Sequence, residues 1–227
     1  MADRVPPGQV ITRSWPVLHA GSVPNELTPS SWTLNVHGLV AEPFQLSFSD
    51  LLTLPQQEEL TDIHCVTSWS KLGMRWKGVP FQDVASRARP AVSAAFVVME
   101  CEQGFTTSLP LAVLMESDVM LAHSVDGQAL RPEHGGPVRM LVPRRYFYKS
   151  AKWLRGLKFV HVDEPGFWEV RGYSNIADPW EQTRYTVDDV RLIHRMRKAS
   201  LFQPVPPARS DPVPVEDAPS VPGAPRY

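Results

Sequence analysis

The chain has few of the residues that cross-link small domains or bind structural zinc. It contains 2 cysteines among 227 residues, Cys65 and Cys101, and no Cys-x-x-Cys pair. A disulfide-built scaffold and a zinc ribbon are therefore excluded. An excess of one charge is also lacking, because Lys and Arg total 23 and Asp and Glu total 24. That balance gives no bulk attraction to nucleic acid or to an anionic membrane, so neither partner is expected.

Long apolar runs are absent as well. No stretch of about 18 apolar residues occurs, so no membrane-spanning helix is expected. The first residues, MADRVPPGQVITRSWPVLH, hold no apolar secretion segment and no paired arginines. We therefore expect a cytoplasmic protein. The patterns G-x-G-x-x-G, the P-loop, H-E-x-x-H and G-x-S-x-G are also missing, which disfavours the usual nucleotide-binding and hydrolase classes.

Proline is the residue in excess, at 23 residues, about twice its average share of ~5%. Together with 13 glycines, the prolines divide the chain into short segments, which favours a loop-rich mixed fold over a helical bundle. Apolar residues at helical spacing predict a helix over 81–88. Apolar alternation or short apolar runs predict strands at residues 32–36, 94–99, 118–124, 138–142 and 157–162.

Capping residues predict further short helices between these strands. Ser49 precedes one short apolar helix, and Ser108 predicts a cap for another at residues 109–116. Thr186 and Asp189 are spaced like a capping box that opens a last helix, which carries an apolar stripe. Because strands and helices do not alternate regularly, we predict an α+β fold with a mixed or antiparallel sheet.

Composition divides the chain into three parts. Residues 1–30 are predicted to form an extended N-terminal arm, residues 31–200 the folded domain, and residues 201–227 a disordered tail. The tail has eight prolines within residues 204–227 and no apolar period. Polyproline segments can dock in aromatic grooves, so the tail is either a partner-docking element or a solubilising extension. Its composition favours the second interpretation.

Cys65 stands in the segment DIHCVTSWS, among polar neighbours. A lone cysteine is most often a small buried apolar residue. Thiolate is also a soft ligand that suits transition metals, and the adjacent His64 could favour the thiolate form. From these residues alone both interpretations stay open.

Cations and aromatic residues alternate in the segment HGGPVRMLVPRRYFYKSAKWL, residues 134–154. Cationic side chains beside exposed backbone N–H groups form an anion site, most naturally for phosphate, and neighbouring aromatic rings could hold a planar ring system. A solvated basic hairpin is the structural alternative. RNA binding through basic and aromatic residues is another, which the net charge of −1 disfavours.

Taken in order, these segments resemble the molybdopterin domain of the sulfite oxidase family, in particular its heme-free bacterial branch. The similarity covers about residues 10–185. It runs through SSWTLNVHGLVAEPFQLSFSDLLTLP, DIHCVTSWSKLGMRWKGVPFQDV, ECEQGFTTSLPL, LAHSVDGQALRPEHGGPVRMLVP, YKSAKWL, GFWEVRGY and ADPW. The resemblance implies that residues 31–200 form a mixed-sheet domain with short helices and long loops, which binds molybdenum and molybdopterin.

The resemblance also implies roles for individual residues. Cys65 would be the catalytic residue, with its thiolate bound to molybdenum. Basic side chains would form charge-assisted bonds to the phosphate of the pterin. The implied cofactor-binding residues are Arg13, Cys101, His134, Arg139, Ser150, Ala151 and Lys152. The residues considered for the substrate face are His64, Arg144, Arg145 and Tyr146, for which an ordinary structural role is the alternative.

The implied activity is oxygen-atom or two-electron transfer on a small oxyanion or an S- or N-oxide. The chain length leaves no room for the heme and dimerisation domains of animal sulfite oxidases, so electrons are expected to pass to an electron-transfer partner that the sequence does not identify. The alternative is a non-catalytic module of the same fold that binds pterin or another phosphate ligand.

Overall fold

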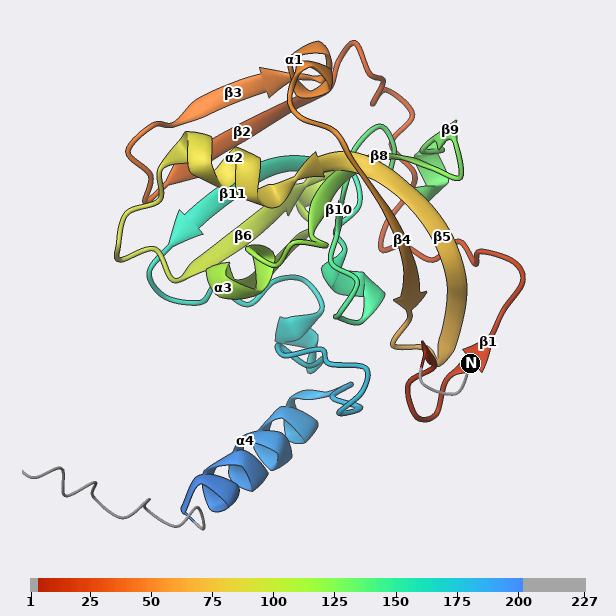
Figure 1. Ribbon diagram of the computed structural model, residues 1–227, viewed down its shortest axis with the longest axis vertical. Helices are drawn as coiled ribbons and strands as arrows, with labels where there is room; N and C mark the ends of the chain where they lie inside the picture. Colours follow the sequence, from red (N-terminus) through yellow and green to blue (C-terminus); the bar gives the residue numbers. More distant parts are fainter. Residues whose placement is uncertain (1–3, 202–227) are drawn as a thin grey trace, which may run out of the picture.

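Two β-sheets, built from the alternating apolar segments, form the body of the molecule (Figure 1). The computed structural model describes residues 4–201, so the predicted Pro-rich tail lies outside the described residues from 202 onward. The five-stranded sheet has the order β3 (Phe44–Ser47), β2 (Thr33–Gly38), β11 (Leu154–Val160), β6 (Phe96–Cys101) and β7 (Thr106–Pro110). Within it β11 runs parallel to β2, and the other pairs are antiparallel.

The long strand β5 (Trp69–Pro80) is the centre of the six-stranded sheet. The order of this sheet is β1 (Val10–Ile11), β5, β8 (Met120–Val125) and β10 (Arg139–Leu141), with β4 (Gln57–His64) also paired to β5 and β9 (Gln128–Ala129) to β8. β1 is parallel to β5, and the remaining pairs are antiparallel. The predicted α+β class with mixed sheets is therefore confirmed.

The helices are short except for the last. They are α1 (Phe48–Thr53), α2 (Phe81–Ala88), α3 (Leu111–Leu114) and α4 (Thr186–Leu201). Turns of 3₁₀ type lie at Glu102–Gly104, Pro132–His134, Phe147–Lys149 and Glu169–Arg171. Across residues 4–201, no helix combines the length and the apolar character that crossing a membrane requires.

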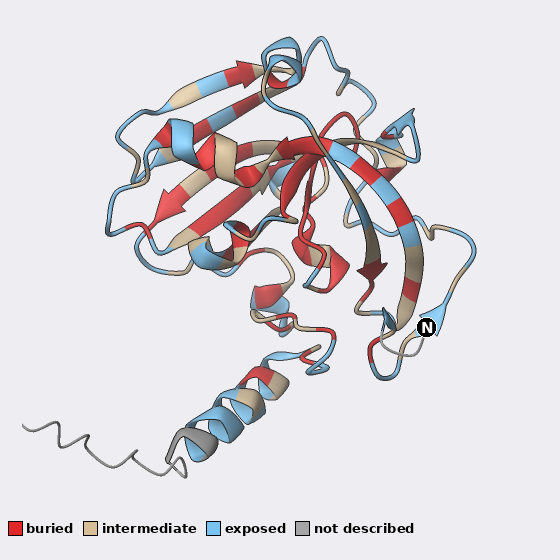
Figure 2. Cartoon of the chain, viewed as in Figure 1, coloured by how far each residue is buried: buried red, intermediate tan, exposed pale blue. Residues whose placement is uncertain are grey.

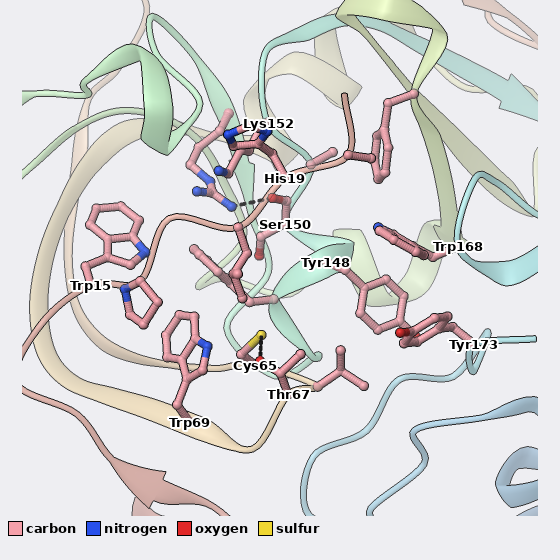
Figure 3. A pocket seen from close by; sticks show the side chains of 18 of the residues that line it. Trp15, His19, Cys65, Thr67, Trp69, Tyr148, Ser150, Lys152, Trp168 and Tyr173 are labelled. Atoms are coloured by element: carbon pink, nitrogen blue, oxygen red, sulfur yellow. Dashed lines mark hydrogen bonds between the residues drawn. The ribbon is translucent and has the colours of Figure 1, made fainter. Parts of the chain in front are cut away.

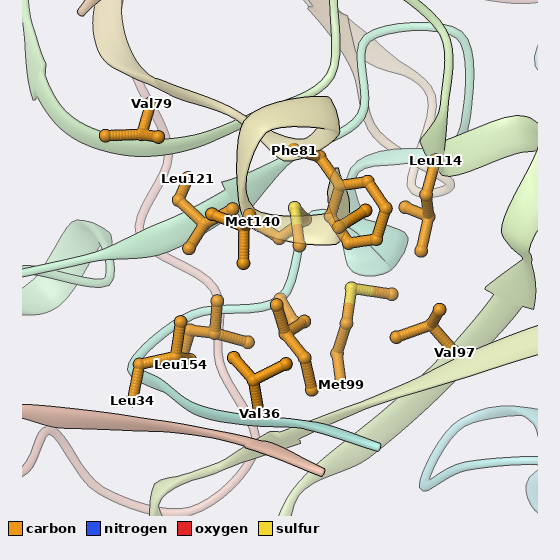
Figure 4. Packing of buried hydrophobic residues seen from close by; sticks show 14 of the residues in the cluster. Leu34, Val36, Val79, Phe81, Val97, Met99, Leu114, Leu121, Met140 and Leu154 are labelled. Carbon is orange, nitrogen blue, oxygen red and sulfur yellow. The ribbon is translucent and has the colours of Figure 1, made fainter. Parts of the chain in front are cut away.

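The main core fills the space between the facing sides of the two sheets (Figure 4). Side chains from the five-stranded sheet meet side chains from the six-stranded sheet and from helix α2. The residues labelled there are Leu34, Val36, Val79, Phe81, Val97, Met99, Leu114, Leu121, Met140 and Leu154, and none is more than 1% exposed. Burial of each such side chain contributes about 1.5–3 kcal/mol to stability.

The six-stranded sheet is buried on its second face too. Along β8, Leu121 points into the main core, whereas Met120 and Ala122 belong to a second apolar cluster. Along β10, Met140 and Leu141 divide in the same way. Successive side chains of a strand point to opposite faces, so burial on both faces produces a continuous apolar run. Arg139, two residues before Leu141, is therefore directed to the face of the second cluster.

Two of the predicted helix starts are wrong. The N-cap of α1 is Ser47 and not Ser49, because Ser47 and Asp50 form a reciprocal capping box with the required three-residue spacing. Ser108 caps no helix: it lies in β7, its hydroxyl donates to Asp163, and α3 begins only after Pro110. Pairing of β7 with β6 prevails over the local capping preference of serine.

Helix α4 begins at Thr186 as predicted, but its capping residue differs. The carboxylate of Asp189 accepts hydrogen bonds from Ser174 and from the backbone of Asn175, while Asp188 accepts from the backbone N–H of Tyr185 at 3.0 Å. The apolar stripe on α4 does not pack on the sheets. Figures 1 and 2 show the helix extending away from the body with mostly exposed side chains.

Candidate functional site

A cavity of about 300 Å³ lies beside the loop that joins β4 to β5 (Figure 3). Segments from distant parts of the chain surround it: residues 15–20 of the N-terminal arm, the loop itself, residues 147–153 after β10, and single side chains from β10 and from three further segments. The lining residues include Trp15, His19, Cys65, Thr67, Trp69, Phe105, Arg139, Phe147, Tyr148, Ser150, Lys152, Trp168 and Tyr173. This volume is within the range of small-molecule sites, which is about 300–1,000 Å³.

A tight reversal of the chain places Cys65 on the cavity wall. The Ser68 N–H donates to the Cys65 carbonyl at 3.0 Å, and Ser68 has a φ of 72°. This is a short hairpin connection in which a left-handed residue returns the chain to the sheet. The side chain of Cys65, with its residue 8% exposed, lies against the cavity, and its Sγ is 3.2 Å from Thr67 Oγ1.

Two cations share this cavity, the buried Arg139 and the half-buried Lys152. Arg139 lies over the ring of Phe147 at 4.0 Å and donates to the carbonyl oxygens of His134 and Ser150. Lys152 donates to the carbonyl oxygen of Glu133 at 2.6 Å, while the Glu133 carboxylate pairs with another residue. Over residues 4–201, neither Arg139 nor Lys152 has a carboxylate oxygen within salt-bridge distance. Their positive charge is therefore not neutralised locally.

The surroundings lower the basicity of these groups. Burial lowers the pKa of Lys152 to about 7, with the nearby Arg139 as the next cause. Burial also lowers the pKa of Arg139 to about 9. The pKa of His134 falls to about 4, through burial and then through the charge of Lys152. An anion in the cavity would reverse these shifts, because an opposite charge favours the protonated form.

The cofactor residues that the resemblance implies do not all reach the cavity. Cys65, Arg139, Ser150, Ala151 and Lys152 line it. Ser150 also has a structural role, since its hydroxyl accepts from the Val142 N–H at 2.9 Å.

The other three implied residues lie outside the cavity wall. His134 is one layer behind it: its ring stacks on Trp15 at 3.7 Å, and its buried Nδ1 has no hydrogen-bond partner in the part of the chain that the structure describes. Cys101 is buried in the main core, and burial raises the pKa of its thiol. Arg13 is exposed, and its backbone carbonyl accepts from Lys71.

The residues considered for the substrate face also lie elsewhere. Arg144 pairs with Glu116 and Asp118, and together with His64 it borders a separate, open hollow. Arg145 lies 4.0 Å from Asp178, and Tyr146 is fully buried. Of these four residues, none lines the cavity that contains Cys65.

The sequence pattern indicated only the part of the aromatic wall that lies in residues 134–154, where Phe147, Tyr148 and Trp153 line the cavity. Trp15 and Trp69 come from the first third of the chain, whereas Trp168 and Tyr173 follow the last strand. The high count of 7 tryptophans was the available signal, but it does not indicate which of them meet.

The arrangement suits a flat anionic ligand that carries a metal. Aromatic rings can enclose a planar group, buried cations can bind a phosphate, and a thiolate can bind a soft metal. No cluster of three or more His, Cys, Asp or Glu side chains able to hold a metal ion is found among residues 4–201.

Comparison with known proteins gives the family. The family model described as "Oxidoreductase molybdopterin binding domain" matches residues 20–168. The chain is 46% identical over 187 residues to the uncharacterized oxidoreductase YuiH of Bacillus subtilis, covering 82% of this chain and 94% of that protein.

More distant relatives carry names of sulfur enzymes. The chain is 30% identical over 170 residues to the putative protein-methionine-sulfoxide reductase subunit YedZ1 of Azospira oryzae, covering 74% of this chain and 64% of that protein. It is 27% identical over 203 residues to the protein-methionine-sulfoxide reductase catalytic subunit MsrP of Ralstonia nicotianae, covering 80% of this chain and 60% of that protein. Among solved structures, the sulfane dehydrogenase SoxCD from Paracoccus pantotrophus matches with a TM-score of 0.58 and 25% identity, covering 65% of this chain and 42% of that one.

Proposed function

Because this chain belongs to the oxidoreductase molybdopterin binding domain family, we propose that it is an enzyme that removes an oxygen atom from an organic S-oxide, with Cys65 as the protein ligand of molybdenum. The cofactor of the family is molybdopterin with molybdenum. The choice of a sulfur substrate is supported by the names of the relatives, which are a methionine sulfoxide reductase and a sulfane dehydrogenase.

The residues around the cavity fit this cofactor. The observation that carries the proposal is that the Cys65 thiol shares one cavity with the buried Arg139 and the half-buried Lys152, two cations with no carboxylate partner among residues 4–201. The buried Nδ1 of His134, which also lacks a partner in the described structure, adds an unused polar atom behind the same wall. Burying uncompensated charge is costly, so such a site is typical of one built for an anion.

Different residues of the cavity would bind different parts of the cofactor. When bound, the cofactor supplies a two-electron redox centre that can accept or release an oxygen atom. Arg139 and Lys152 bind the anionic phosphate group, and Cys65 ties the metal to the hairpin loop. The aromatic wall of Trp15, Trp69, Trp168 and Tyr173 orients the planar ring and limits the access of water.

The net reaction needs an outside source of electrons. Reduction of an S-oxide breaks the S–O bond and releases the oxygen as water, which consumes two electrons and two protons. We propose that a separate electron-transfer protein supplies these electrons, and that it acts with this chain in the cytoplasm. Cell fractionation followed by immunodetection tests the location directly.

Paired cysteine variants test the proposal. Full-length wild type, Cys65→Ala and Cys101→Ala are produced in a host that makes the cofactor, and molybdenum, pterin and turnover of methionine sulfoxide with a reduced dye are measured. We expect about one molybdenum per chain and turnover in wild type and Cys101→Ala. Cys65→Ala should keep its fold and lose turnover by at least about 100-fold, since even outer groups around a metal contribute 10–100-fold.

Two outcomes would contradict the proposal. Unchanged turnover in metal-loaded Cys65→Ala would exclude Cys65 from the chemistry. Bound pterin without molybdenum or turnover in wild type would instead support the non-catalytic binding module.

A further inference from the structure

The loop that carries Cys65 is held from outside the cavity by two distant residues. Gln9 donates through Nε2 to the Cys65 carbonyl at 3.1 Å. Arg184 donates through Nη1 to the carbonyl oxygen of Val66, the next residue along. The two donors are far apart in the sequence, yet they bind the carbonyl groups of two consecutive residues in the same tight reversal.

Arg184 is well placed to hold this loop rigidly. Its guanidinium lies 5.0 Å from the centre of the Tyr146 ring, a fully buried side chain. Its backbone is fixed at both polar groups, because its N–H donates to Asp188 at 3.2 Å and its carbonyl accepts from the Ser174 N–H at 2.9 Å. A planar guanidinium held by a ring and by its own backbone loses little entropy when it forms one more hydrogen bond.

The same residue connects the loop to the opposite wall of the cavity. Ser174, which bonds to the backbone of Arg184, also accepts a hydrogen bond from the hydroxyl of Tyr148 through its carbonyl oxygen. Tyr148 lines the cavity, as does Cys65. Contacts therefore run from the aromatic wall, through Ser174 and Arg184, to the loop that carries the thiol.

The charge of Arg184 is used for this contact and not for an ion pair. Within residues 4–201, no carboxylate oxygen lies within salt-bridge distance of its guanidinium, whereas nearby Arg191 pairs with Asp188 and Arg195 with Glu181. A hydrogen bond from a charged donor is roughly twice as strong as a neutral one. The strongest polar contact of this side chain is thus made to the residue next to Cys65.

We infer that Arg184 is a positioning residue that fixes the Cys65 loop and so sets where the thiol points into the cavity. This inference rests on the proposed role of Cys65 at the metal. Arg184 itself does not line the cavity, so its role would be to position Cys65 from outside. Loss of the contact should free the loop and misplace the sulfur atom while the sheets stay intact.

The first test measures the loop without any catalysis. Full-length wild type, Arg184→Met and Arg184→Lys are prepared without cofactor, their folding is checked by circular dichroism and thermal unfolding, and alkylation of Cys65 by iodoacetamide is timed by mass spectrometry. We expect Arg184→Met to react at least about tenfold faster, the effect of losing one hydrogen bond to a charged group. Arg184→Lys keeps a donor and should be intermediate, and Arg191→Met should match wild type.

The same experiment has an internal reference. Cys101 is buried in the main core and should remain unreactive in every variant that is folded. A faster reaction of Cys65 in Arg184→Met, with Cys101 still unreactive, therefore reports on movement of the loop. If Arg184→Met unfolds, the Arg184→Lys variant decides the matter. Equal alkylation rates in wild type and the folded Arg184 variants overturn the inference.

The second test uses the loaded enzyme. Arg184→Met should keep molybdenum, shift the cysteine-to-metal charge-transfer absorption and lose at least about tenfold in kcat with KM little changed, because a small misplacement of a reacting group is costly. An unchanged absorption spectrum and kcat would also overturn it. If Cys65→Ala leaves turnover intact, the proposed function fails, whereas the alkylation result still reports independently on Arg184.

Discussion

Replacing Lys152 with methionine should stabilise the cofactor-free protein while weakening its hold on the cofactor. Burial lowers the pKa of Lys152 to about 7 in the folded protein, whereas a lysine in an unfolded chain has a pKa near 10.4. Between these two values the unfolded state binds more protons than the folded state, so stability rises with pH over this range. Below pH 7 Lys152 is protonated in both the folded and the unfolded protein, so the folded protein bears the full cost of burying its charge.

The size of the effect follows from that shift. A difference of one bound proton gives the free energy of unfolding a limiting slope of about 1.4 kcal/mol per pH unit. Because Lys152 in the folded protein is still half protonated at pH 7, the average slope between pH 7 and pH 9 is about 1 kcal/mol per pH unit. Between pH 7 and pH 9 the free energy of unfolding of the cofactor-free wild type should therefore rise by about 2 kcal/mol. The Lys152→Met variant should not show this rise. Methionine also loses the bond to the Glu133 carbonyl, worth about 1 kcal/mol, so the net stabilisation at pH 7 is about 1–2 kcal/mol.

Urea unfolding at pH 7, 8 and 9 measures this difference. Lys71→Met is the matched control, because Lys71 also donates to a backbone carbonyl but lies outside the cavity wall. In the loaded protein the phosphate should restore the charge of Lys152, so the pH dependence should shrink and Lys152→Met should retain less cofactor. If the free energy of unfolding depends on pH in the same way in cofactor-free wild type and Lys152→Met, the burial of the Lys152 charge does not have this effect.

Two further substitutions probe the support of the cavity. Lys149 is completely buried and pairs with Glu169 at 2.5 Å, so Lys149→Met should lower the free energy of unfolding in urea by about 3–5 kcal/mol; a loss below about 1 kcal/mol would be inconsistent with that pair. Gly135 has a φ of +99°, and a Cβ there would lie 2.9 Å from the Lys152 Cγ. Gly135→Ala should cost about 1–3 kcal/mol and reduce the molybdenum content, and an unchanged metal content together with an unchanged melting temperature would contradict this placement.

The strands were predictable because alternation and short apolar runs report directly on which faces are buried. The predicted segments at 32–36, 138–142 and 157–162 each overlap an observed strand. Local capping signals were less reliable. Ser108 has the side chain of a helix cap, but pairing of its strand with β6 and its contact with Asp163 decide its conformation.

Apart from Cys65, the site was predictable where several of its residues lie close in sequence. Arg139, Ser150 and Lys152 belong to one segment rich in cations, and all three line the cavity. Arg13 and Cys101 were implied by resemblance, and the structure places neither of them on the cavity wall. The aromatic wall and the contact of Arg184 with the Cys65 loop join residues more than 100 positions apart, and no local pattern encodes such pairs.

The bond between Cys65 and molybdenum is the centre of the proposed function, and molybdenum K-edge X-ray absorption of the loaded protein tests it most directly. Wild type and Cys65→Ser are compared at equal molybdenum content, with Cys101→Ser as the control. We expect one sulfur ligand fewer in Cys65→Ser, and an unchanged number in Cys101→Ser. An identical sulfur count in wild type and Cys65→Ser would contradict it and return Cys65 to the role of a cavity-lining thiol.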